Sequence, residues 1–170
     1  MKTIIKNKNT ITEKDHVIIL SDKKNKISSI SLNSQEKKFI KEQQKENKEI
    51  IILNQYTRKI IVVNPKKINN YNLYLENLRC LGDKVFEEIK GLGVITINTI
   101  EREIINTYAF VEGMALSNYK FTNHKSKKEK EQNLTIYIYK NANSTNISEI
   151  ERLAKAVRVT KDLVNTPFSH

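Results

Sequence analysis

Short apolar runs alternate with longer amphipathic segments along the chain. Apolar-rich runs that are too short for a helix occupy residues 17–20, 50–53, 60–63, 94–100 and 134–139. Runs of this length, bounded by polar residues or by proline, are typical of buried β-strands. The pattern therefore predicts a strand at each of these positions, and parallel sheets are rich in such continuous apolar runs.

The clearest helix is predicted for residues 71–89. Its apolar residues recur at three- and four-residue steps, as a helix with one buried face requires; they are Tyr71, Tyr74, Leu75, Leu78, Leu81, Val85, Phe86 and Ile89. Gly82 within it predicts a close packing contact, because glycine inside a helix costs about 1 kcal/mol relative to alanine. Gly91 is expected to cap the helix at its C-terminal end.

A second amphipathic helix is predicted to follow the strand at 94–100. Its apolar stripe should pack on the sheet and comprises Ile104, Ile105, Tyr108, Ala109, Val111, Ala115, Leu116 and Tyr119. Thr99 is expected to cap this helix, with Glu101 and Glu103 near its positive end. The lysine-rich segment 120–133 that follows it has almost no apolar residue and predicts an exposed loop.

Capping signals predict two further helices. Ser34 can cap a helix that runs to about residue 47, with Glu36 in its first turn and so few apolar residues that it should lie on the outside. Ser148 and Glu151 match the Ser-x-x-Glu capping box, and the helix that begins there should end before Pro167.

Strands that alternate with helices predict an α/β fold. We expect one domain over residues 1–170, built as a mainly parallel or mixed sheet flanked by helices, because parallel neighbours need crossover connections. No apolar stretch is long enough to span a membrane, and Met1 is followed by polar residues rather than by a signal core. With Cys80 as its single cysteine, the chain suits a reducing, cytoplasmic setting.

The net charge of +11 leaves nucleic acid as an alternative partner. A basic surface attracts phosphate, but lysine far outnumbers arginine, and asparagine and isoleucine are also abundant, so compositional bias accounts for much of the charge. Tyr119 and Phe121 beside Lys120 and Lys125 imitate the aromatic and basic pattern of single-strand binders only weakly, since Tyr119 already has a place in the helix core. A stand-alone basic nucleic-acid-binding domain is therefore the second hypothesis.

Few residues have the pattern of a catalytic or metal site. The histidines at positions 16, 124 and 170 do not have the spacing of metal ligands. The two glycine-rich motifs that bind phosphate, Gly-x-Gly-x-x-Gly and Gly-x-x-x-x-Gly-Lys-Ser/Thr, are both absent from the sequence. The aspartates at 15, 22, 83 and 162 could still be paired by the fold. Cys80 lies in an amphipathic helix without a histidine nearby in sequence, which predicts an inert, semi-buried thiol.

Two stretches carry a specific resemblance to a known family. Residues 109–128, AFVEGMALSNYKFTNHKSKK, and residues 151–170, ERLAKAVRVTKDLVNTPFSH, resemble motifs of the leucyl (cytosol) aminopeptidase family in order and spacing. Residues 78–90 are similar more loosely. The family-motif residues, read as structural, are Glu112, Gly113, Tyr119, Phe121, Lys125, Asp162, Leu163, Asn165 and Pro167.

The resemblance implies a non-catalytic amino-terminal domain with a macro-domain-like sandwich, in which residues 147–167 lead towards a catalytic domain outside this chain. In the family that second domain binds two divalent metal ions, zinc or manganese, and removes N-terminal residues from peptides. Its metal-binding run Asn-Thr-Asp-Ala-Glu-Gly-Arg-Leu is absent here, so no catalytic, cofactor or metal residue is carried over. The implied partners are the chain's own catalytic domain and like subunits of a hexamer. An ADP-ribose pocket, which the topology alone would suggest, lacks its glycine-rich loops.

Overall fold

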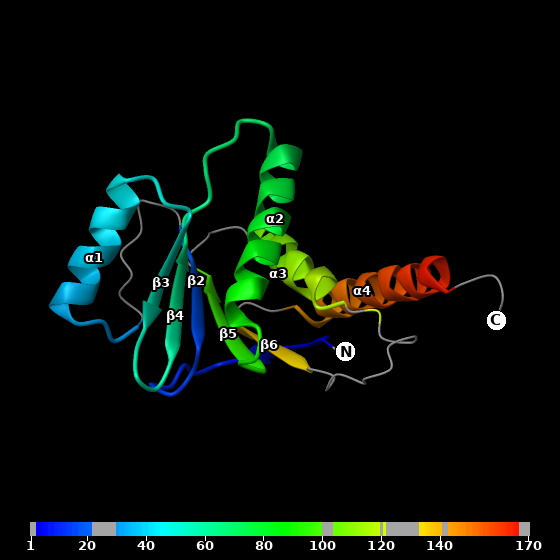
Figure 1. Cartoon of the computed structure of the whole chain (residues 1–170), viewed down its shortest axis with the longest axis horizontal. Helices are drawn as coiled ribbons and strands as arrows, with labels where there is room; N and C mark the ends of the chain where they lie inside the picture. The colour runs from blue at the N-terminus through cyan, green and yellow to red at the C-terminus, as the bar shows by residue number, and fades with distance from the viewer. Residues whose placement is uncertain are drawn as a thin grey trace.

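The computed structural model describes residues 3–21, 30–99, 104–119, 121, 133–140 and 143–166. Within them six strands form one sheet, accompanied by four helices (Figure 1). The strands are β1 (Thr3–Lys8), β2 (Val17–Leu20), β3 (Ile50–Asn54), β4 (Lys59–Val63), β5 (Val94–Thr99) and β6 (Leu134–Tyr139). The helices are α1 (Ser34–Lys45), α2 (Tyr71–Ile89), α3 (Ile104–Ser117) and α4 (Ser144–Asn165).

The sheet is mixed and its strand order is β1-β6-β5-β2-β4-β3. All neighbours run parallel except β3 and β4, which form an antiparallel hairpin at one edge. The predicted α/β class with a mainly parallel sheet is thereby confirmed. Parallel pairing explains the continuous apolar run of β2, whose residues are all buried because both faces of the strand are covered.

Strand β1 was not expected from the apolar pattern. Its sequence TIIKNK has only two apolar residues in succession, yet it pairs with β6 along its whole length as an edge strand. The side chain of Glu151 on α4 accepts a hydrogen bond from the backbone N–H of Ile5, at 3.1 Å. That contact satisfies a donor on a strand edge that would otherwise be open to pairing with another chain.

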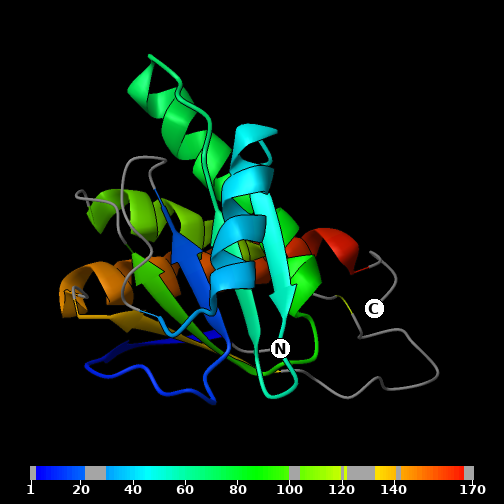
Figure 2. The same cartoon turned by 90° about the vertical axis from the view of Figure 1, so that its left-hand side faces the viewer.

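The helices cover the two faces of the sheet unequally (Figures 1 and 2). The main core lies between the sheet and α2, α3 and α4, with Leu78, Phe110 and Ile136 among its fully buried residues. A smaller core on the opposite face joins α1 to β2, β3 and β4 through residues such as Ile40. The expectation that α1 would lie on the outside agrees with Ile40 being its one buried residue.

Helices α2 and α3 approach each other closely at two glycines. A Cβ atom on Gly82 would overlap the carbonyl oxygen of Phe110, and one on Gly113 would overlap the carbonyl oxygen of Arg79. The close contact predicted for Gly82 is confirmed, and Gly113 is its counterpart on α3. Gly91 follows the C-cap residue Lys90 with φ of 96°, where glycine avoids steric strain, as its predicted capping role requires.

Two of the three predicted N-caps, Ser34 and Ser148, are wrong. The cap of α1 is Asn33, not Ser34: Asn33 and Glu36 form a reciprocal capping box at 2.8 Å in each direction. Helix α4 begins at Ser144 and is capped by Asn143, so Ser148 lies inside it and its hydroxyl donates to the carbonyl of Thr145. In each helix, an asparagine that precedes the expected serine in sequence accepts the capping hydrogen bond instead.

Some residues of the predicted buried stripes are exposed. Tyr71 and Ile105 are exposed because each lies in the first turn of its helix, and Figure 1 shows that the start of α2 rises beyond the sheet. Cys80 is also exposed rather than semi-buried.

Thr99 ends β5, whereas Glu101, Glu103 and nearly all of the predicted loop 120–133 lie outside the described residues. No helix in the described part of the chain is long and apolar enough to cross a membrane.

Candidate functional site

The two family motifs meet where the end of α3 contacts the last turns of α4. The hydroxyl of Tyr119 donates to Asp162 Oδ1 at 2.9 Å, and Asn165 Nδ2 lies 3.5 Å from the Tyr119 oxygen. Asn165 also donates to the carbonyl of Lys161, whose Nζ lies 5.2 Å from the centre of the Tyr119 ring. These contacts join residues 43 positions apart in sequence. We call this group, Tyr119, Lys161, Asp162 and Asn165, the α3–α4 junction.

The junction is a structural contact rather than a site of proton transfer. Desolvation and the neighbouring Asp162 carboxylate raise the pKa of Tyr119, although the Asn165 amide opposes the shift. The phenol therefore stays protonated at neutral pH and continues to donate to Asp162. The direction of the last turns of α4 is set by this bond together with the cation over the tyrosine ring.

The outer face of α4 is an exposed apolar surface. Ile150 and Ala154 are buried against the main core, whereas four apolar residues of the same helix are exposed: Leu153 by 42%, Val159 by 51%, Leu163 by 72% and Val164 by 79%. Figure 1 shows the last turns of α4 extending beyond the sheet. Leu163 and Val164 are adjacent in sequence, and contiguous exposed apolar residues mark interaction surfaces in soluble proteins. We call Leu153, Val159, Leu163 and Val164 the α4 outer face.

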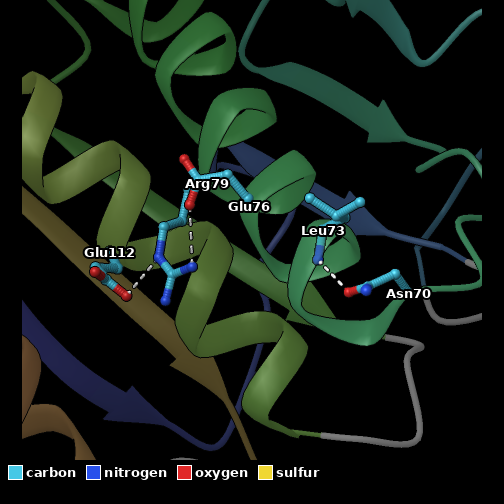
Figure 3. A network of polar contacts seen from close by, with 5 residues as sticks. All are labelled: Asn70, Leu73, Glu76, Arg79 and Glu112. Atoms are coloured by element: carbon cyan, nitrogen blue, oxygen red, sulfur yellow. Dashed lines mark hydrogen bonds and ion pairs between the residues drawn. The ribbon is translucent and has the colours of Figure 1, made fainter.

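The motif residues Glu112 and Gly113 hold α3 against α2. Arg79 Nε donates to Glu112 Oε2 at 3.0 Å and its Nη1 lies 3.3 Å from Glu76 Oε2 (Figure 3). The two carboxylates raise the pKa of Arg79 despite its partial desolvation, which acts in the opposite direction. Beside this pair, Gly113 lets the α3 backbone contact the Arg79 carbonyl. Both motif residues therefore act in helix packing.

The structure describes some of the remaining predicted site residues, and others lie outside the described residues. Phe121 is half-buried, and Leu163 belongs to the α4 outer face. Lys125 and Pro167 lie outside the described residues, as do His124, His170 and Asp22. Among the described residues no three histidine, cysteine, aspartate or glutamate side chains are grouped as metal ligands.

The described aspartates do not form a dyad. Asp15, Asp83 and Asp162 bind different partners, namely Lys8 with Thr12, Ser117 and Tyr119 respectively. His16 accepts a hydrogen bond at Nδ1 from the backbone of Lys59, at 2.9 Å. Each of these side chains is therefore used to connect elements of the fold.

Asp15 makes the stability of the fold sensitive to acid. Burial raises its pKa, but hydrogen bonds from Lys8 Nζ and Thr12 N, both at 2.7 Å, outweigh this and lower the pKa below its usual 3.8. A carboxyl whose pKa is lower in the folded state stabilises the fold above its unfolded pKa, and this stabilisation disappears as the pH falls through the folded value. We expect Asp15→Asn to lower the melting temperature at pH 7, and the difference from wild type to shrink below about pH 4. A difference that stays constant down to about pH 2 would contradict this assignment.

A polar cleft of about 260 Å³ lies beside the start of α1. It is lined by Glu13, Ser31, Asn33, Glu36, Gln55, Thr57 and Arg58. Arg58 is buried, and its guanidinium donates to Gln55 Oε1 at 2.7 Å and to the carbonyl of Ser31 at 3.0 Å. Glu36 accepts from Gln55 Nε2 as well as from the α1 cap. Arg58 thus connects the β3–β4 turn to the segment before α1, a role that no sequence pattern indicated.

Comparison with known proteins identifies the fold. No protein-family model matches the sequence, and no curated protein matches it. Among solved structures, a tomato leucine aminopeptidase variant matches with a TM-score of 0.63 and 13% identity, over 98% of this chain and 38% of that one. Leucine aminopeptidase of Caenorhabditis elegans matches with a TM-score of 0.56 and 14% identity, over 98% of this chain and 37% of that one.

A maturation enzyme also shares the fold. The bottromycin maturation enzyme BotP matches with a TM-score of 0.61 and 11% identity, over 90% of this chain and 33% of that one. BotP has also been solved in complex with Mn. The chain therefore spans about a third of the length of these solved structures. The likeness confirms the fold that the sequence motifs implied: this chain has the fold of one part of the leucine aminopeptidases.

Proposed function

We propose that the chain is the non-catalytic assembly and regulatory domain of a cytoplasmic leucine aminopeptidase. On this proposal residues 1–170 form one domain, and residues 147–167 lead towards a second domain that removes N-terminal residues from peptides. That second domain would hold two divalent metal ions, zinc or manganese, and the whole protein would assemble with like subunits, as a hexamer. The support is the shared fold over part of each leucine aminopeptidase, together with the two sequence motifs.

The observation that carries the proposal is the α4 outer face. Leu163 and Val164 are exposed on the last helix, next to the α3–α4 junction that fixes its direction. Full burial of such side chains is worth about 1.5–3 kcal/mol each, so a domain packed there would gain considerable stability. The face is therefore suited to contact with a second folded domain.

The charges beside this face argue against a second copy of the chain as its occupant. Arg152, Lys155 and Lys161 are exposed on α4 near the apolar residues. Two copies that packed through α4 would bring these cations together, and like charges at an interface are unfavourable. A different domain, with carboxylates around an apolar centre, fits the surface better.

The purified chain is expected to lack peptidase activity. We expect no hydrolysis of leucine amide above background with Mn²⁺ or Zn²⁺ added, because the described residues include no group of metal ligands. A leucine aminopeptidase at the same molar concentration serves as the positive control. Metal-stimulated turnover that stays with the protein through successive purification steps would overturn the non-catalytic assignment.

The reading frame that follows codon 170 gives an independent test. We expect it to encode a domain with the carboxylate-rich metal motif of the aminopeptidases. A stop codon in that position would contradict the proposed parent enzyme and would favour a stand-alone binding domain.

A further inference from the structure

One half of a sheet face has no described helix packed on it. The smaller core on that face draws its members from α1, the segment before it and β2, β3 and β4, with Ile11 at its margin. None of its members comes from the described residues of β5, β6 or β1. Figures 1 and 2 show α1 beside β3 and β4, with the other three helices across the sheet. The side chains of β1, β5 and β6 that point to the α1 side therefore lack a covering helix among the described residues.

Two tyrosines and two lysines occupy this half, which no described helix covers. In β6 the alternate residues Leu134, Ile136 and Ile138 are buried in the main core, which turns Tyr137 and Tyr139 to the opposite side, where both are half-exposed. In β1 the buried Thr3 and Ile5 alternate with Lys6 and Lys8 in the same way. The register pairs Lys6 with Tyr137 and Lys8 with Tyr139. We call Tyr137, Tyr139, Lys6 and Lys8, together with Lys140, the tyrosine face.

The cations of this face already lie against the aromatic rings. Lys8 Nζ is 5.3 Å from the centre of the Tyr137 ring, and Lys140 Nζ is 4.9 Å from that of Tyr139. Asp15 neutralises Lys8 at 2.7 Å, whereas Lys6 is exposed. The face thus combines two ring surfaces two residues apart on one strand with an excess of positive charge.

We propose that the tyrosine face binds single-stranded nucleic acid, with two bases stacked on Tyr137 and Tyr139 and the phosphates held by Lys6 and Lys140. Aromatic side chains with interleaved cations are the means by which sequence-tolerant single-strand binders hold an unpaired strand. Double-stranded DNA is the poorer fit, because its major groove admits a helix or a two-stranded ribbon and its bases are not free to stack on tyrosine. This binding does not depend on the proposed aminopeptidase parent.

The test is fluorescence anisotropy with a labelled oligothymidylate of about 12 nucleotides and with a duplex of equal length. We expect the single strand to bind more tightly than the duplex, and its affinity to fall between about 50 and 200 mM NaCl because bound phosphates release counterions. Tyr137→Ala and Tyr139→Ala should each weaken binding of the single strand on the order of tenfold. Tyr137→Phe keeps the aromatic ring and should therefore keep the affinity of wild type.

The matched control removes the same charge from another surface. Lys37→Ala with Lys41→Ala neutralises two exposed lysines on α1, and it should weaken binding far less than Lys6→Ala with Lys140→Ala. Equal losses from the two pairs, or unchanged affinity in both tyrosine variants, would show that the attraction is diffuse and would overturn the proposal. So would tighter binding of the duplex, or no binding of the single strand.

A second measurement avoids any risk that the alanine variants unfold. Photocrosslinking of wild-type protein to an oligonucleotide that contains 5-iodouracil, followed by mass spectrometry, should place the crosslinks on Tyr137 or Tyr139. Crosslinks confined to α1 or α4 would contradict the proposed face.

Discussion

Alanine at Gly113 is expected to remove a large part of the stability of the fold. The new methyl group would overlap the backbone carbonyl of Arg79, which cannot rotate away as a side chain could. Gly82→Ala meets the carbonyl of Phe110 on the other helix in the same way. Overpacking of this kind costs typically about 1–3 kcal/mol and occasionally more, and forced separation of α2 and α3 would also open the main core. We expect each variant to lose about 3 kcal/mol out of a total near 5–15 kcal/mol.

The expected change in the free energy of unfolding has the opposite sign to the usual effect of replacing glycine by alanine in a helix. On a helix with free space, glycine to alanine stabilises by about 1 kcal/mol. Thermal and urea unfolding of the purified variants should instead show clear destabilisation. Lys84→Ala, at an exposed position on α2, is the control and should change the free energy of unfolding by less than about 0.5 kcal/mol. A raised melting temperature for Gly113→Ala would mean that the two helices are not in backbone contact.

The sequence predicts the fold where a residue's neighbours along the chain determine its burial. Strands β2 and β4 are buried on both faces, so their apolar runs signal them without knowledge of the partner strands. The helix repeat of α2 is equally local, and its glycine predicted the contact with α3. Strand β1 could not be found in this way, because its pairing with β6 crosses more than 120 residues of chain and only one of its faces is buried.

The candidate surfaces depend on the arrangement of layers, which local patterns do not encode. The sequence LTIYIY of β6 predicts a strand, but only the placement of α1 over β3 and β4 shows that Tyr137 and Tyr139 lack a covering helix among the described residues. Similarly, the capping signal and Pro167 predict a helix that includes Leu163, but only the structure shows that this side chain is exposed. At the weak aromatic and basic pattern of Tyr119 and Phe121, the structure shows the Tyr119 hydroxyl donating to Asp162.

The double variant Leu163→Asp with Val164→Asp should weaken contact with the second domain without unfolding the isolated chain. Both side chains are more than two-thirds exposed in this chain, so the melting temperature of the isolated chain should change little. In a longer polypeptide that carries the second domain, the same change would bury two carboxylates and lose the apolar contact of two side chains. Each lost side chain is worth about 1.5–3 kcal/mol, so domain contact should weaken by at least about a hundredfold.

Limited proteolysis and sedimentation of that longer polypeptide measure the effect. We expect the double variant to be cleaved rapidly between the domains and, with its domains no longer packed together, to sediment more slowly than wild type, since interfaces fail when buried charge lacks a partner. Lys37→Asp supplies the control: it changes the charge of the chain by the same two units but lies at an exposed position on α1, so it should leave assembly nearly intact. If the double variant assembled as wild type does, the α4 outer face would not be the interface. If instead the isolated chain unfolded, the exposure of Leu163 and Val164 would itself be wrong, because aspartate at a solvent-facing helix position is tolerated at a cost of less than about 1 kcal/mol.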